Sequence, residues 1–300
     1  MRKNRGYDYR EIIGAQDDGS SVLDYLARRY AHTSRDSWRA RVEAARVLLD
    51  GIVVASDRRL RSGEELIWRR PAWQEPDAPR CFAILFEDED LLAVAKPAGL
   101  PTLPGGGFLD NTLLALVRAY DAEASPLHRL GRWTSGLVLF ARTPESRARL
   151  SRAWRERSVL KRYLALASGR AREREFAVSV PIGRIPYAPL ERLYAASARG
   201  KPALSRVRVL EQRDGDFLAE VKIETGRPHQ IRIHLAAAGH PLAGDPLYGP
   251  GGTPGPASTA LPGDPGYHLH AVELELDHPG KRSRLRLHCP APPPLRPARG

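Results

Sequence analysis

The chain has 300 residues, of which 42% are hydrophobic and 27% charged. These values are ordinary for a folded protein of one or two domains, and they exclude wholesale disorder, a disulfide-stapled miniprotein and a membrane-embedded chain. The 47 Lys and Arg outnumber the 35 Asp and Glu, which leaves a net charge of +12. Such an excess predicts a polyanionic partner, and nucleic acid is the polyanion we favour. An arginine-rich background composition would explain the choice of Arg over Lys but not the net charge.

Residues 1–20 are polar and irregular, and we expect little order there. The first 13 residues, MRKNRGYDYREII, are basic but lack the apolar core of a secretory signal. No apolar run reaches the roughly 18 residues that span a bilayer. We therefore expect a cytoplasmic protein without a membrane partner.

Residues 21–70 are predicted to form a small α/β unit. Val22, Tyr25 and Leu26 recur at helical spacing, and a second apolar stripe runs from Trp38 to Leu49. Gly51 is expected to end the second helix, before a short strand at residues 52–54. Arginines accompany the second stripe at positions 35, 39, 41 and 46. The unit is therefore suited to a nucleic-acid backbone, although a helical pair that only packs on the next domain is the alternative.

A second, larger domain is predicted at residues 81–295, after a proline-containing linker at 71–80 and before a tail at 296–300. Short apolar or alternating runs predict strands at 82–86, 91–95, 135–141, 163–167 and 217–223. Helical spacing appears at 112–120 and 146–155. Because strands and helices do not alternate regularly, the predicted class is α+β with a mixed, largely antiparallel sheet.

Several familiar chemistries do not fit the sequence. The glycine-rich run at 103–107 is not followed by the Lys-Ser/Thr of a phosphate-binding loop. His128 and Ser135 lack the strand–turn–helix setting of a hydrolase nucleophile. The two cysteines, Cys81 and Cys289, have no ligands at zinc spacing. We expect neither a metal nor a cofactor.

Three polar segments are more specific. They are EDEDLLAVAKPAGL at 87–100, LHRLGRWTSGLVLFA at 127–141 with KRYLA at 161–165, and GRPHQIRIHL at 226–235 with GHPLAGDPLYG at 239–249. Taken in order, they resemble the signature segments of the large-subunit-type (RluA/RluD-like) RNA pseudouridine synthases, over essentially residues 20–295. The preceding unit resembles the small S-four-type RNA-binding domain.

The resemblance implies that the protein isomerises uridine to pseudouridine in structured RNA, either ribosomal or transfer RNA, without a cofactor. The target base would leave the stack and enter a pocket. Tyr163 would stack on it, and Arg232 would pair with the catalytic aspartate and hold it ionised. The residues expected at the RNA are Arg35, Arg39, His128, Arg129, Arg132, Thr134, Lys161, Arg227, His229 and Gln230. We expect the protein to act as a monomer.

One position departs from the family pattern. The family's second segment reads His-Arg-Leu-Asp-Arg, with the aspartate as catalytic group, and this chain has Gly131 there. Arg232 would then be a buried charge in need of another anion, and Asp110, Glu145 and Asp245 lie in other segments. Three hypotheses remain: an active enzyme in which another group replaces the aspartate, an inactive RNA-binding protein, or an introduced glycine. All three require Tyr163 and Arg232 to converge on one cavity beside Gly131.

Overall fold

The computed structural model describes residues 3–31 and 33–298. The chain divides into two compact units, Met1–Glu75 and Pro76–Gly300, and the division falls inside the stretch predicted as a linker. In the described residues, no helix is both long and apolar enough to cross a membrane.

The first unit combines a four-stranded antiparallel sheet with two helices. The strands follow the order β1-β4-β2-β3. The bounds are β1 Tyr7–Ile12, α1 Val22–Arg29, α2 Arg35–Glu43, β2 Val47–Leu49, β3 Ile52–Val53 and β4 Glu65–Arg70, with a 3₁₀ turn at Ala15–Asp17. Ser21 and Ser34 cap the two α-helices, since each side chain accepts a backbone N–H from the first turn.

The prediction that residues 1–20 lack order is wrong for Tyr7–Ile12. This segment pairs along its whole length with β4. Tyr9 stacks on Trp68 with ring centroids 4.8 Å apart, and Ile13 is buried in the unit's core. The core needs this strand because the sheet would otherwise leave the Trp68 ring uncovered.

The second helix is also shorter than predicted. It ends at Glu43, and Ala45 takes a left-handed conformation (φ 56°). Residues 47–49 then form β2, and Gly51 lies in the turn to β3 rather than at a helix end. Val47 and Leu49 are buried in either arrangement, so the apolar spacing alone did not distinguish helix from strand.

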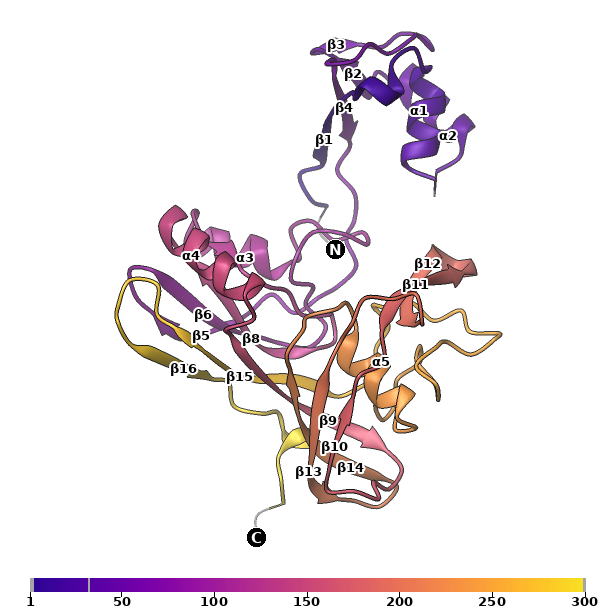
Figure 1. Ribbon diagram of the computed structural model, residues 1–300. Coiled ribbons are helices and arrows are strands. Elements are labelled where there is room, and N and C mark those ends of the chain that lie inside the picture. Colours follow the sequence, from indigo (N-terminus) through magenta and orange to yellow (C-terminus); the bar gives the residue numbers. More distant parts are fainter. Residues whose placement is uncertain (1–2, 32, 299–300) are drawn as a thin grey trace. The chain divides into compact units, whose positions relative to one another are not determined.

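The second unit is built on a mixed, largely antiparallel sheet, as predicted (Figure 1). Its main path runs β10-β13-β14-β9-β15-β8-β6-β5. Off this path, β16 pairs with β15 and β7 pairs with β8. The β15–β8 pair is parallel. The strands are β5 Ala83–Glu87, β6 Leu91–Lys96, β7 Ser125–Pro126, β8 Ser135–Ala141, β9 Leu160–Ser168, β10 Glu175–Val178, β13 Ser205–Gln212, β14 Asp216–Ile223, β15 Leu269–Asp277 and β16 Arg284–His288.

Helices cover both faces of this sheet. Leu113 and Val117 of α3 (Leu113–Tyr120) pack with Val94 on one face, whereas Leu150 of α4 (Pro144–Arg155) packs with Leu91 on the other. A two-stranded sheet of β11 (Ile182–Tyr187) and β12 (Glu191–Ala196) lies beside α5 (Gln230–Ala237) (Figure 1). Single 3₁₀ turns occupy Ala188–Leu190 and Pro293–Leu295.

Alternating side chains divide the interior into these two layers, as expected for strands. The predicted strands and helices of this unit all form, with bounds that differ by a few residues. The helix α5 was not predicted, because its polar and apolar residues alternate and nearly all are buried, so it lacks the one-sided apolar stripe that marks a surface helix.

Candidate active site

The second signature segment crosses the middle of the large sheet. β8 pairs with β6 on one side and with β15 on the other. Before it, the chain turns so that the Thr134 N–H donates to the Gly131 carbonyl at 3.1 Å. Lys96, at the end of β6, donates from Nζ to two carbonyls of the loop 97–100 and to that of Arg132, at 2.7 to 3.0 Å. These bonds tie the first two segments together, and burial lowers the pKa of Lys96 to about 7.

A cavity of about 460 Å³ opens where the segments meet. Tyr163 of β9 lies in its wall, next to Val221 of β14 and Ala271 of β15. The full lining is Leu127, His128, Arg129, Trp154, Arg155, Arg157, Lys161, Tyr163, Ile223, Glu224, Thr225, Gly226 and Arg227. We call it the Tyr163 cavity. Five cationic side chains and one carboxylate line it, which gives a formal charge of +4.

Burial sets the chemistry of the cavity wall. It raises the pKa of Tyr163 to about 12, so this side chain presents a neutral ring. Burial, reinforced by the charge of Lys161, lowers the pKa of His128 to about 4. His128 Nε2 accepts the Leu139 N–H at 3.1 Å, and its ring stacks on Trp154. His128 is therefore a neutral part of the wall, whereas Arg129, Arg155 and Arg157 are exposed at the rim.

Four of the residues predicted to contact RNA are buried or hydrogen-bonded within the protein. Gln230 is 3% exposed. Its amide oxygen accepts the Thr225 hydroxyl and the Arg227 N–H, and its amide nitrogen donates to the Leu204 carbonyl and the Ser205 hydroxyl. Arg132 donates to the carbonyls of Gly99 and Asp77. Thr134 is 4% exposed. Burial, followed by the charges of Arg232 and Arg129, lowers the pKa of His229 to about 3. Burial and these bonds restrict the four side chains, and their contact with RNA stays a prediction.

Arg232 of α5 does have an anionic partner. Its Nε and Nη2 donate to the two carboxylate oxygens of Asp245, both at 2.7 Å, and Nη1 donates to the Pro262 carbonyl at 3.0 Å. Asp245 also accepts the N–H groups of Leu247 and Tyr248. Both side chains are buried, at 3% and 0% exposed. Burial would lower the pKa of Arg232, but the bonds to Asp245 raise it overall.

The convergence of Arg232 and Tyr163 on one cavity beside Gly131 stays a prediction. Neither Arg232 nor Gly131 lines the Tyr163 cavity; Gly131 follows its rim residue Arg129 by two positions and is exposed. Asp245 cannot replace the family aspartate, because its oxygens are buried and already accept four donors. What lies nearest to Gly131 is the hydroxyl of Tyr267, a residue that the sequence did not single out. A Cβ on residue 131 would lie 3.2 Å from it.

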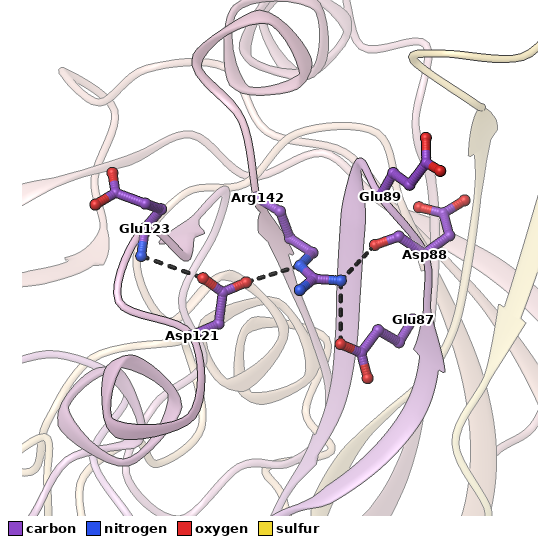
Figure 2. A pocket seen from close by; sticks show the side chains of 6 residues that line it. All are labelled: Glu87, Asp88, Glu89, Asp121, Glu123 and Arg142. Atoms are coloured by element: carbon purple, nitrogen blue, oxygen red, sulfur yellow. Dashed lines mark hydrogen bonds and ion pairs between the residues drawn. The ribbon is translucent and has the colours of Figure 1, made fainter.

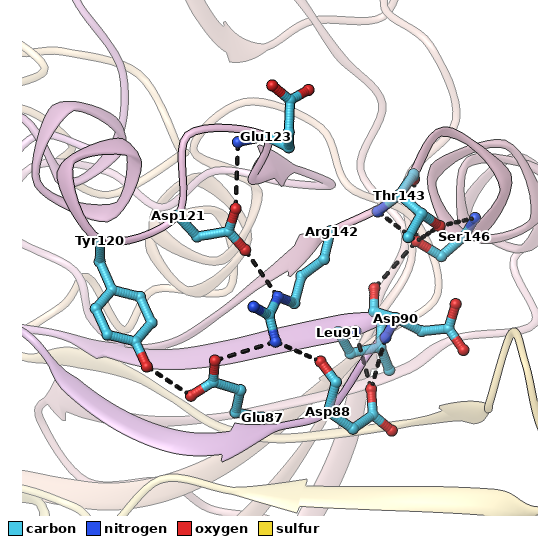
Figure 3. A network of polar contacts seen from close by, with 10 residues as sticks. All are labelled: Glu87, Asp88, Asp90, Leu91, Tyr120, Asp121, Glu123, Arg142, Thr143 and Ser146. Carbon is cyan, nitrogen blue, oxygen red and sulfur yellow. Dashed lines mark hydrogen bonds and ion pairs between the residues drawn. The ribbon is translucent and has the colours of Figure 1, made fainter.

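A larger hollow, of about 740 Å³, lies elsewhere in the second unit and is acidic. Five carboxylates line it with one arginine, Arg142, so its formal charge is −4 (Figure 2). Arg142 donates to Asp121 at 2.7 Å and to Glu87 at 3.0 Å. The contacts continue to the α4 cap, where Ser146 bonds Thr143 and the Asp90 carbonyl (Figure 3). This network fastens α4 to the sheet, and its charge would repel RNA.

In the first unit, the two predicted RNA contacts form ion pairs on the surface. Arg35 bonds Asp24 at 2.8 Å and Asp57 at 3.1 Å, and Arg39 lies 3.3 Å from Asp36. These pairs are exposed, so a phosphate could compete for either arginine at little cost. Arg41 is different, because its guanidinium packs against the rings of both Trp38 and Trp68, 4.4 and 4.8 Å from their centroids.

Comparison with known proteins now defines the class. Residues 90–237 match the family model described as RNA pseudouridylate synthase. The chain is 43% identical over 276 residues to an uncharacterised RNA pseudouridine synthase of Synechocystis sp. (strain PCC 6803), covering 91% of this chain and 95% of that protein. It is 40% identical over 215 residues to the ribosomal large subunit pseudouridine synthase D of Nitrosomonas europaea, covering 70% and 62%.

A solved structure supports the same class. The human RNA pseudouridylate synthase domain containing 1 matches with a TM-score of 0.59 at 28% identity, covering 74% of this chain and 89% of that one. Fold and sequence together define an RNA-modifying isomerase. The chain belongs to the RNA pseudouridine synthase family, on its RluA/RluD-like branch.

Proposed function

We propose that the Tyr163 cavity receives an everted uridine of structured RNA and that the protein converts it there to pseudouridine. The cavity carries this proposal. Its volume of about 460 Å³ lies in the range that holds small ligands, and its wall offers the neutral aromatic ring of Tyr163. A flipped base needs such a ring for stacking, and its phosphates need the cations at the rim.

The cations at the rim set the mode of binding. Arg129, Arg155 and Arg157 are exposed, and no ion pair that involves them is found within residues 3–31 and 33–298. Arg227 donates to the Pro202 carbonyl at 3.2 Å, which holds it at the mouth without neutralising it. Phosphate contacts of this kind position RNA, whereas the cavity selects the base.

The proposal extends to the first unit and to the setting of the reaction. The first unit, with α1 and α2 against its small sheet, acts as an S-four-type RNA-binding domain that uses Arg35 and Arg39. Ribosomal or transfer RNA is the substrate, and one relative is named for the ribosomal large subunit. Because isomerisation consumes nothing, the protein works without cofactor or metal. It works as a monomer in the cytoplasm.

A direct assay tests the activity. The protein is incubated with unmodified transcripts of ribosomal and transfer RNA, and pseudouridine is mapped by chemical derivatisation and reverse transcription. We expect one or a few modified uridines, formed equally well in EDTA. Bound RNA that stays unmodified under all conditions would favour the inactive RNA-binding protein and refute the proposal.

A further inference from the structure

The hydroxyl of Tyr267 lies beside the place that the Cβ of a side chain at position 131 would occupy. A Cβ built on Gly131 would lie 3.2 Å from the Tyr267 Oη and 3.4 Å from the Thr134 Oγ1. Gly131 itself is exposed, whereas Tyr267 is 5% exposed. Because glycine has no side chain, it leaves the hydroxyl uncovered from this direction.

The backbone holds Tyr267 firmly in this place. Gly244 and Gly266 cross so closely that a Cβ on either would lie within 2.4 Å of the other's carbonyl oxygen, and both have positive φ. Glycine at both positions therefore allows the chain just before Asp245 to meet the chain just before Tyr267. The indole of Trp133 donates to the Gly263 carbonyl at 2.8 Å, which ties the same loop to the second segment.

The hydroxyl is buried but only weakly hydrogen-bonded. In the described ranges its one recorded hydrogen bond is the contact with Thr134 Oγ1, and at 3.4 Å this bond is long. A buried phenol normally has a close partner. The Tyr267 Oη therefore retains capacity to donate or accept toward a group placed over Gly131.

Charged groups surround the ring on its other side. The Arg232 guanidinium lies 4.2 Å from the Tyr267 ring centroid, and Asp245 is bonded to that guanidinium. A cation at this distance from an aromatic ring is attracted to the face of the ring. Arg232, which the family motif pairs with the aspartate, thus acts in this chain on a phenol.

We propose that Tyr267 is a catalytic residue whose hydroxyl takes the place of the carboxylate missing at Gly131. The inference rests on the proposed function. After losing its proton to solvent, the phenol takes the proton from C2′ of the ribose as the C1′–N1 bond breaks. The sugar then holds a C1′–C2′ double bond, and N1 of the uracil keeps the electron pair of the broken bond.

The second half of the step restores the tyrosine. After the uracil turns, its C5 bonds to C1′ while the phenol returns its proton to C2′. The proton displaced from C5 goes to N1. Product and substrate are isomers, and no oxidant, reductant or co-reactant enters. A general base at the sugar is a role open to tyrosine.

Four proteins test this role: the wild type, Tyr267→Phe, the double variant Gly131→Asp/Tyr267→Phe, and Tyr120→Phe. The last is a matched control, because it also removes a hydrogen-bonded tyrosine hydroxyl. The Tyr120 hydroxyl donates to Glu87 at 2.8 Å, at the acidic hollow and away from the site. Release of tritium from transcripts carrying 5-tritiated uridine measures turnover, and urea unfolding checks the fold of each protein.

We expect Tyr267→Phe to lose roughly 10²–10⁴-fold in kcat, the usual range for a general base, with RNA affinity unchanged. The double variant should recover part of the loss, because the carboxylate enters the space that the hydroxyl leaves. The control should match the wild type. In addition, 3-fluorotyrosine at position 267 is a more acidic phenol. It should move the rise of the pH–rate profile to lower pH, which a purely structural role of Tyr267 would not do.

The outcomes separate the two proposals. An active wild type with an equally active Tyr267→Phe, or an unmoved pH profile, overturns the role of Tyr267 and leaves the proposed function standing. A wild type that releases no tritium from any transcript overturns both.

Discussion

Two hollows in the second unit differ in charge and in the state of their arginines. Arg142 in the acidic hollow is committed to Asp121 and Glu87 (Figure 3), whereas Arg129, Arg155 and Arg157 stand exposed around the Tyr163 cavity. The acidic hollow is the larger of the two, about 740 against 460 Å³. Size is therefore a poor guide to the site here. An arginine with its carboxylates in place stabilises the fold, and exposed arginines around an aromatic wall suit RNA.

Among the variants that compare the two hollows, the largest effect is expected at the aromatic wall. Tyr163→Leu keeps an apolar side chain in the core but removes the ring. The rate of RNA turnover should therefore fall by the equivalent of the lost stacking energy, about 1–3 kcal/mol. Tyr163→Phe keeps the ring and serves as the control. Because the pKa of Tyr163 is raised to about 12, its hydroxyl stays protonated at neutral pH and does not act as a base, so Tyr163→Phe should retain activity. If Tyr163→Phe failed as badly as Tyr163→Leu, stacking would be the wrong role.

Lys96 should affect stability rather than binding. Lys96→Met leaves three carbonyls without their donor, at a cost of about 1–3 kcal/mol. The folded pKa of about 7 lies below the ordinary lysine pKa of 10.5, so the unfolded chain binds more protons between these values. Wild-type stability should thus gain about 1.4 kcal/mol per pH unit there relative to the variant. Urea unfolding at pH 7 and 9 checks this, and a constant difference would contradict it.

The rim should produce a smaller effect that depends on salt. Arg155→Ala should lower the slope of log affinity against log salt by about 0.7–0.9, the value for one phosphate contact. Arg147→Ala is the matched control, because Arg147 is exposed on the same helix but does not line the cavity. Filter binding over a salt series gives both slopes, and equal slopes would show that RNA does not follow this rim.

The smallest effect on RNA is expected at the acidic hollow. Arg142→Met breaks the bonds to Asp121 and Glu87 and should cost about 1 kcal/mol of stability, but RNA turnover per folded molecule should not change. A variant that folds yet loses turnover would place the acidic hollow in the reaction and undo the comparison between the two hollows.

The sequence predicts the large sheet well because its strands carry local signals. Ser135–Ala141 forms with the predicted bounds, and Tyr163 lies in the cavity wall as its motif implied. The strand Tyr7–Ile12 was missed, although the aromatic residues alternate at Tyr7 and Tyr9; a pairing with β4, more than fifty residues away, gives no local signal.

The part of the site that was not predicted depends on contacts between distant segments. Asp245 reaches Arg232 in a segment where His229, the residue before α5, takes a left-handed conformation (φ 56°) and the chain crosses itself at Gly244 and Gly266. Tyr267 lies outside every quoted motif. Its proximity to Gly131 follows from the parallel pairing of β15 with β8, which no periodicity in the sequence encodes.

The central claim is that uridine is isomerised at the Tyr163 cavity although residue 131 is glycine. Tritium release from 5-tritiated uridine in unmodified ribosomal and transfer RNA measures this most directly. We predict release by the wild-type protein and its loss in Tyr163→Leu. Binding of the RNA without release by the wild type, in a preparation shown to be folded, would contradict the claim.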